Sequence, residues 1–462
     1  MLRVSAACEA AGVPASTLVC EGFIRQAAAT SVGLGLPSMP VALVPSHPDA
    51  LSKDELRRNT LEITTEKVIE NLMRAGSAAT DDAEPAERDI VFAGGFEEVN
   101  DFFCDKEWSD GLPVVPPTRE RVERFLKFTD RKPEEVLGVM LPDNRAATVW
   151  SIAVNGVMAG CRPEYMPILV ALVEAMADPR YGVEHSGNTP GSETLVILNG
   201  PIIKQLGFNY TQGVLRDGFR PNTAVGRFWR LYLRNVAGFL LHKTDKGCYG
   251  NTFRVICAEN EDALARIKWE PNSVEMGFAA GDNTVTIARY SGGNVIASVS
   301  GDTPEGILAN VAYALARQTF CWNLTFLLGS AYGTIRPLVL LSPILAETIA
   351  KHGWSKRDVK QYLFDHARQP AWEVERGLRD WMNKPIWNLA EEADAGRIPK
   401  VFHESDDANR MVPHVFKPED YMIAVTGDPL RTNAYVFAQN GRLGYPVGKK
   451  IHLPRDWKEP RK

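Results

Sequence analysis

The sequence predicts an α/β protein, of mixed α/β to α+β class, in which a small open parallel sheet precedes a large mixed unit. Residues 4–11 have the pattern of a helix, and residues 15–20 and 39–45 are apolar runs of strand length with a helix opening between them. Two strands joined through a helix form a parallel pair. Strand and helix patterns further on follow no strict βαβ period, which favours a mixed sheet.

The N-terminal sheet is predicted to be truncated. Open parallel sheets bind substrates at the carboxyl ends of their strands, usually in the first strand-to-helix turn. Met1 stands almost on the first helix, so the strand and turn expected before it are missing. We therefore expect an incomplete sheet edge beside residues 15–20.

The later elements follow from spaced apolar residues, from apolar runs bounded by turn residues, and from helix starts such as Thr118 and Pro163. A helix is expected over residues 53–75. In the large unit we expect helices at 119–128, 146–160, 164–177, 223–241, 303–319 and 356–366, and strands at 194–198, 253–257, 284–288, 294–298 and 337–341.

Composition divides the chain into three parts. Residues 76–89 (GSAATDDAEPAERD) are small and acidic and contain proline, which is typical of a solvated linker. They separate a truncated α/β unit, residues 1–75, from a large mixed unit, residues 90–462.

Charge and cysteine usage exclude several classes of protein. The net charge of −5 over 462 residues gives no electrostatic footprint for nucleic acid. No apolar run approaches the roughly 20 residues of a membrane helix, and no signal peptide is visible. Seven scattered cysteines favour reduced thiols in a cytoplasm. Without a CxxC pair or an HExxH motif, we expect no dedicated metal site.

A first candidate site combines the turn at Asn199 and Gly200 with the helix opened by Asn222. A flexible turn at a strand end lets a ligand approach the backbone, and a helix N-terminus attracts anions. Arg227 and Arg230 are three residues apart, so both guanidinium groups are expected on one face, where they suit a carboxylate or phosphate. The alternative is that Asn199 caps a turn and the arginines form ion pairs.

A second candidate site is the loop from residue 245 to residue 261. It carries Lys246, Cys248, Asn251 and Glu259 around a strand, so basic, thiol, amide and acidic groups converge. Lys246 paired with a buried Asp245 could act as a general base. The alternative is an exposed turn followed by a helix cap.

Two other residue types are candidates for catalysis. His185, in a loop before the strand at 194–198, is a candidate base or ligand, although a lone loop histidine is usually surface. Cys161, which precedes Arg162, and Cys248 are candidate nucleophiles. Cys20, Cys257 and Cys321 lie in apolar runs and are expected to be inert.

Two resemblances add to this interpretation. Through Glu9, Gly12-Val13-Pro14, Phe23, Gly35-Leu36-Pro37 and the loop at 45–48, residues 4–75 resemble the UGSC family of selenoproteins and their cysteine homologues. Through the strings DGLPVVPPT, CRPEY, NGP, NTAVGRFWR, CAENE and GWSKRDV, residues 108–370 resemble uncharacterised bacterial proteins encoded beside, or fused to, UGSC proteins.

The UGSC resemblance implies a selenocysteine or cysteine, in a Sec/Cys-Gly-Ser-Cys motif, immediately upstream of Met1. We hypothesise that a selenocysteine TGA codon was read as a stop, so that the natural reading frame starts earlier. The alternative is a degenerate domain that kept only a scaffold role.

Two functions are open. In the first, the chain is an enzyme, an oxidoreductase or lyase, that uses thiol or selenol chemistry on a small anionic or polar substrate. In the second, it is a non-catalytic binding or assembly subunit, with the open sheet edge pairing with another chain. Either function is compatible with a homo- or hetero-oligomer. An in-frame TGA upstream of Met1, followed by Gly-Ser-Cys codons, would favour the enzyme.

Overall fold

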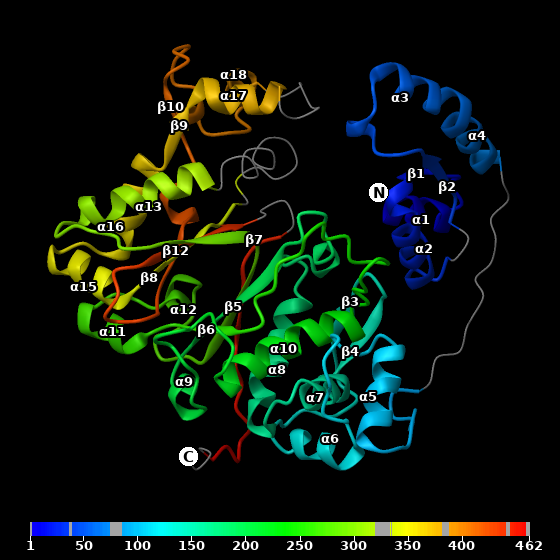
Figure 1. Cartoon of the computed structure of the whole chain (residues 1–462), viewed down its shortest axis with the longest axis horizontal. Coiled ribbons are helices and arrows are strands. Elements are labelled where there is room, and N and C mark those ends of the chain that lie inside the picture. The colour runs from blue at the N-terminus through cyan, green and yellow to red at the C-terminus, as the bar shows by residue number, and fades with distance from the viewer. Residues whose placement is uncertain are drawn as a thin grey trace.

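The computed structural model of the chain describes residues 2–36, 39–73, 86–318, 333, 335–380, 388–439 and 444–458 (Figure 1). The fold is mixed α/β, as predicted, with a small parallel sheet near the N-terminus and a larger mixed sheet after it. None of the helices in these ranges is long and apolar enough to cross a membrane.

The N-terminal unit is a two-stranded parallel sheet with helices around it. Strand β1 (Thr17–Cys20) pairs in parallel with β2 (Val41–Val44), which confirms the predicted pair. No other described strand pairs with β1. The helical elements are α1 (Leu2–Ala10), η1 (Glu21–Phe23), α2 (Ile24–Gly33), η2 (Pro48–Ala50), α3 (Lys53–Asn59), the π-turn η3 (Thr60–Thr64) and α4 (Thr65–Met73). The predicted linker lies mostly outside the described residues, so the domain boundary stays a prediction.

A seven-stranded mixed sheet forms the centre of the large unit. Its order is β11-β8-β12-β7-β5-β6, with β13 paired to β7. Strands β5 and β6 are parallel, β7 is antiparallel to β5, and β8 is parallel to β11. The strands are β5 (Glu193–Asn199), β6 (Ile256–Ala258), β7 (Thr284–Ile296), β8 (Leu338–Leu341), β11 (Met422–Val425), β12 (Ala434–Gln439) and β13 (Val447–Lys450).

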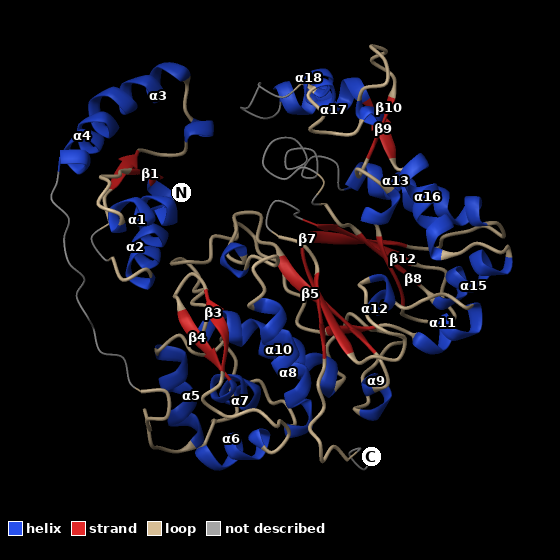
Figure 2. Ribbon diagram, turned by 180° about the vertical axis from the view of Figure 1, so that it is seen from behind, coloured by secondary structure: helices blue, strands red, loops and turns tan. Residues whose placement is uncertain are grey.

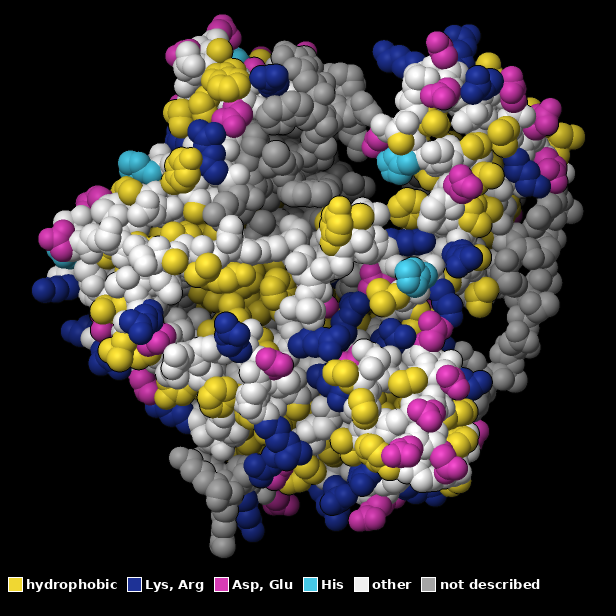
Figure 3. Space-filling model, viewed as in Figure 1, with side chains coloured by type: hydrophobic (Ala, Val, Ile, Leu, Met, Phe, Trp, Pro, Cys, Tyr) yellow, Lys and Arg dark blue, Asp and Glu magenta, His cyan; other side chains and the backbone are white. Residues whose placement is uncertain are grey.

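The sheet curls until its two edge strands meet. The amide N–H of Asn260, after β6, donates to the carbonyl of Val425 in β11 at 2.7 Å, and the Thr426 hydroxyl donates to the carbonyl of Ala258. Residues from the six strands other than β13 therefore face one enclosed hydrophobic cluster, which includes Leu195 and Phe437. Other hydrophobic side chains gather in a hollow on the face of the molecule that Figure 3 shows.

Two helical layers cover the outside of the curled sheet (Figure 2). One layer consists of α5 (Phe96–Asp105), α6 (Arg119–Leu126), α7 (Val149–Met158), α8 (Met166–Met176), α9 (Ile202–Gln205) and α10 (Arg220–Asn235). The other consists of α11 (Glu261–Ile267), α13 (Pro304–Gln318), α15 (Pro343–Lys351), α16 (Lys356–His366), α17 (Ala371–Asp380) and α18 (Leu389–Asp394). The short helix α12 (Asn272–Glu275) packs near β7 and β11.

Some predicted elements differ from the structure. Residues 284–298 were expected to form two strands but form the single long strand β7, because its two halves pair with different partners. The helix expected from residue 146 begins at Val149, because residues 145–148 form β4, a hairpin partner of β3 (Val136–Met140). The small hairpin of β9 (Arg368–Pro370) and β10 (Met411–Pro413) was not predicted.

Candidate functional site

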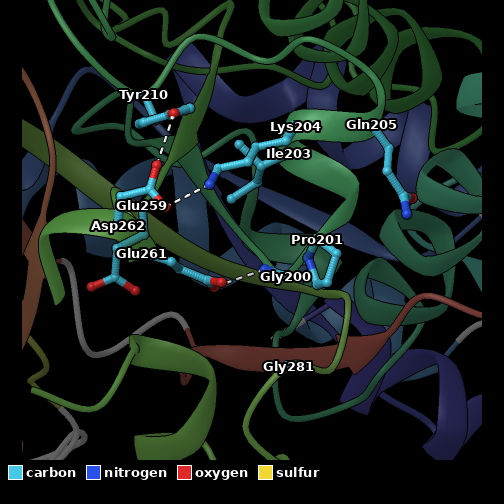
Figure 4. A pocket seen from close by; sticks show the side chains of 10 residues that line it. All are labelled: Gly200, Pro201, Ile203, Lys204, Gln205, Tyr210, Glu259, Glu261, Asp262 and Gly281. Atoms are coloured by element: carbon cyan, nitrogen blue, oxygen red, sulfur yellow. Dashed lines mark hydrogen bonds and ion pairs between the residues drawn. The ribbon is translucent and has the colours of Figure 1, made fainter. Parts of the chain in front are cut away.

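The candidate site is a pocket of about 520 Å³ at the carboxyl ends of two parallel strands. Strand β5 ends at Asn199 and β6 ends at Ala258, and the start of antiparallel β7 lies beside Asn199. Open α/β sheets bind ligands at this end of parallel strands. The lining residues are Gly200, Pro201, Ile203, Lys204, Gln205, Tyr210, Glu259, Glu261, Asp262 and Gly281 (Figure 4).

The Asn199 side chain links two carboxylates at the floor of this site. Its Nδ2 donates to Oε2 of Glu259 at 2.7 Å and to Oε1 of Glu261 at 3.1 Å. The same Glu261 oxygen also accepts the backbone N–H of Gly200 at 2.7 Å (Figure 4). Two donors thus fix Oε1 of Glu261, whereas no hydrogen bond from the described residues reaches its Oε2.

Glu259 is a fully buried carboxylate with several donors. Its Oε2 also accepts the N–H of Asn272 at 2.7 Å, and its Oε1 accepts the N–H of Val425 at 3.2 Å. The ammonium group of Lys356 lies 3.3 Å from the same Oε1 and donates to the carbonyl of Ile423. Because its charge is paired and its lone pairs are occupied, Glu259 holds the site together instead of meeting a ligand.

A polar chain lines one side of the pocket. Lys204 donates to Asp262 at 2.5 Å, and the Tyr210 hydroxyl donates to the other oxygen of Asp262 at 3.2 Å. The bond from Lys204 lowers the pKa of Asp262 below its ordinary value, whereas burial and the nearby Asp262 raise the pKa of Tyr210. Asp262 is therefore ionised and Tyr210 keeps its proton at neutral pH.

Gly200 is required by the shape of the turn. Its φ of +100° lies in the region that favours glycine, and an added Cβ would stand 2.5 Å from Oδ1 of Asn283. That Oδ1 accepts the N–H of Ile202 and closes the turn. The strand expected before Asn199 and Gly200 is confirmed, whereas the approach of a ligand to this turn stays a prediction.

The structure corrects the predicted anion site at Arg227 and Arg230. Arg227 donates to both oxygens of Asp110, at 3.1 and 2.8 Å. Arg230 pairs with Asp245 at 2.6 Å and with Glu193 at 3.5 Å. Both guanidinium groups are occupied by carboxylates from other segments, and neither lines the pocket. The expectation that they face the turn at Asn199 is therefore wrong.

Asn222, predicted to open the ligand-binding helix, has a structural role instead. Its Oδ1 accepts the N–H of Asn209, and its Nδ2 donates to the carbonyls of Asn209 and Ile256. The side chain is buried, so all of these bonds are made inside the protein. They hold the start of α10 against β6, away from the surface of the pocket.

The second predicted site is divided between two places. Glu259 bonds to Asn199 of the first candidate site, whereas Lys246 donates to the carbonyl of Gly22 in the N-terminal unit at 2.7 Å. Asn251 bonds to backbone carbonyls of Gly191 and Ser291. The expected pocket of Lys246, Asn251 and Glu259 is therefore not formed.

The glycines around Lys246 have a packing role. The N–H groups of Lys246, Cys248 and Asn251 donate to carbonyls of residues 187, 189 and 191. A Cβ on Gly191 would stand 2.6 Å from Gly250, so only glycine allows the two loops to approach. We call the two paired loops, residues 184–191 and 244–251, the platform. The platform contacts the N-terminal unit through Lys246 and through Thr244, whose carbonyl accepts a hydrogen bond from Gln26.

His185 and the cysteines lie apart from the pocket. His185 is exposed at the end of η5 (Val183–His185), next to Glu184, which pairs with Arg3 at 3.5 Å. Cys248 is exposed on the platform. Burial raises the pKa of Cys161, and it raises that of Cys257 to about 12, so neither is a thiolate at neutral pH. The expectation that Arg162 favours a Cys161 thiolate is wrong; Cys321 lies outside the described residues.

Sequence reasoning missed Lys204, Tyr210 and Asp262 and did not single out Glu261. Part of the alternative for the second site, a helix cap after the loop, is confirmed, because Asn260 caps α11 by accepting the N–H of Ala263. Lys204 and Tyr210 carry no local signal, because they meet Asp262 only through the parallel pairing of β5 with β6. Within the described parts of the chain, no cluster of three His, Cys, Asp or Glu side chains is placed to hold a metal ion.

Comparison with known proteins identifies only the first part of the chain. No curated protein and no solved structure matches the chain. The model of the UGSC family matches residues 1–74, in agreement with the predicted resemblance, whereas the likeness of the large unit to uncharacterised bacterial proteins stays a prediction. The N-terminal unit of this chain is therefore of the UGSC type.

Proposed function

We propose that the chain is an enzyme that acts on a small polar molecule bound in the pocket at the ends of β5 and β6. The observation that carries this proposal is the carboxylate of Glu261. Two N–H donors hold its Oε1, and its Oε2 has no partner among the described residues. A carboxylate fixed at one oxygen is preorganised to accept a proton or to orient a substrate with the other.

Tyr210 supplies the complementary group. It stays protonated at neutral pH, and its hydroxyl donates to Asp262, which Lys204 holds from the other oxygen. When a substrate atom replaces Asp262 as the acceptor of this hydroxyl, Glu261 as proton acceptor and Tyr210 as proton donor form an acid–base pair suited to proton transfer, elimination or addition. This chemistry corresponds to a lyase, one of the two enzyme classes expected from the sequence.

The UGSC-type unit supports a second chemical contribution, from a thiol or selenol. Its α1 and α2 residues contact the platform through Arg3 and Gln26. The family resemblance implies a selenocysteine or cysteine redox group, so such a group is part of the proposal. Such chemistry needs the reducing conditions of a cytoplasm, which we propose as the location.

A non-catalytic assembly subunit is the second candidate, favoured by the surface of the N-terminal unit. Leu18 of β1 is 50% exposed, Leu61 is 59% exposed and Met73 is 82% exposed. Exposed apolar side chains on a two-stranded sheet whose described strands each pair along one edge only favour association with another chain, so a homo- or hetero-oligomer belongs to this proposal.

Turnover of metabolites separates the two candidates. The purified full chain is incubated with a small-molecule cell extract, with and without dithiothreitol, and depletion is followed by mass spectrometry. We expect the wild type to consume at least one polar metabolite. Glu261→Gln should abolish this consumption, and Glu120→Gln, at an exposed position of α6, should leave it unchanged. Consumption that is equal in wild type and Glu261→Gln, or no consumption under either condition, would overturn the enzyme proposal at this pocket.

A further inference from the structure

We infer that the ligand of the pocket is a small organic cation, with an ammonium group against Glu261. This inference rests on the proposed function only in taking the same pocket as the ligand site. A cationic ligand differs from the anionic one that Arg227 and Arg230 suggested, because both arginines form ion pairs with carboxylates outside the pocket.

The charges of the pocket are unbalanced. Three carboxylates and one ammonium group line it. Glu259 is paired with buried Lys356, and Asp262 is paired with Lys204 at 2.5 Å. Glu261 forms no ion pair with any described residue, and Lys204, the one cation in the pocket lining that interacts with its charge, is already bonded to Asp262. The pocket lining therefore carries more negative than positive charge beside Glu261, which favours a cation.

The free hydrogen-bonding atom of Glu261 is an acceptor. Its Oε2 receives no donor from the described chain, and Oδ1 of Asn199, whose side chain does not itself line the pocket, is buried without a hydrogen-bond partner. The amide orientation of Asn199 is determined, because its nitrogen must face the two carboxylates to which it donates. An ammonium group brings three donors and no acceptor, so it complements this pattern, whereas a carboxylate would meet further acceptors.

The remaining wall suits the carbon skeleton of such a ligand. Pro201, Ile203 and the ring of Tyr210 line the pocket beside the acidic residues. An aromatic face also attracts cations and adds to the selectivity over neutral molecules. A short alkylammonium compound would place its charge at Glu261 and its methylene groups against this wall.

Calorimetric titration of the full chain with three four-carbon probes tests the inference: 1,4-diaminobutane, 1,4-butanediol and succinate. We expect the diamine to bind at least tenfold more tightly than the diol, and succinate not to bind. Glu261→Gln keeps the shape of the side chain and removes its charge, so it should weaken diamine binding at least tenfold. Glu120→Gln should leave diamine binding unchanged.

The outcomes separate the ligand class from the proposed function. No diamine binding at millimolar concentration, equal binding of the diol or succinate, or diamine binding unaffected by Glu261→Gln overturns the cation inference. Metabolite turnover that depends on Glu261 would survive that result. Conversely, Glu261-dependent diamine binding without any turnover supports the ligand class and contradicts the enzyme.

Discussion

The ammonium group of Lys356 lies 3.3 Å from Oε1 of Glu259, and both side chains are buried. This contact joins helix α16 to the end of β6, while the N–H of Val425 brings β11 to the same carboxylate. One ion pair thus connects the two edges of the curled sheet directly behind the pocket.

Lys356→Met should destabilise the protein by about 3–5 kcal/mol, because it leaves Glu259 as a buried carboxylate without a cation. Urea unfolding measures the change. Adding Glu259→Gln to that variant should recover part of the loss, since the unpaired charge is removed. A loss below about 1 kcal/mol for Lys356→Met would show that the amide donors of Asn199, Asn272 and Val425, and not Lys356, stabilise Glu259.

Lys246→Ala should loosen the N-terminal unit. The variant removes the bond to the carbonyl of Gly22 and the contact with the ring of Phe23. A hydrogen bond contributes about 0.5–1.5 kcal/mol, so amides of α2 should exchange with deuterium about three- to tenfold faster. Lys243→Ala is the matched control, because Lys243 pairs with Glu107 inside the large unit. Unchanged exchange in α2 would mean that Lys246 does not hold the two units together.

Gly226→Ala should destabilise the protein by more than about 2 kcal/mol, although the same change stabilises most helices. A Cβ at this position would stand 2.3 Å from the carbonyl carbon of Arg254, where α10 crosses the segment before β6. Gly292→Ala in β7 is the control, since no atom lies within 4 Å of its added Cβ. Equal unfolding midpoints for the two variants would refute the close packing of α10.

Lowering the pH should reduce the free energy of unfolding, because His414 is buried in its neutral form. Burial lowers its pKa to about 3, whereas the unfolded chain titrates near its ordinary value of about 6.5. Between these values the unfolded state binds the additional proton, so stability falls as pH drops through that window. From pH 7 to pH 5 the contribution is about 2 kcal/mol. His414→Gln should reduce the pH dependence of urea unfolding by that amount, and exposed His352→Gln should not; equal slopes would contradict the burial of a neutral imidazole.

Three residues in or behind the pocket are also candidates from the sequence, for a physical reason. Asn199, Gly200 and Glu259 stand at the ends of apolar runs, and parallel pairing brings such ends together. Lys204 and Tyr210 stand outside such runs, so only the tertiary fold connects them to Asp262.

The arginines were misinterpreted because their partners are distant in sequence. Asp110 precedes Arg227 by 117 residues, and no local sequence pattern predicts this pair. Gly247 has a distant neighbour too, because an added Cβ would stand 2.9 Å from the Cα of Gly191. A glycine pattern cannot distinguish contact with a ligand from contact with the chain itself.

Crystals of the full chain soaked with 1,4-diaminobutane would test the central claim most directly. We expect electron density for the diamine in the pocket, with one nitrogen within hydrogen-bond distance of Oε2 of Glu261, and no density there in the Glu261→Gln variant. Density only at other places, such as the platform around Lys246, or an unchanged pose in Glu261→Gln, would contradict the assignment of this pocket as the ligand site.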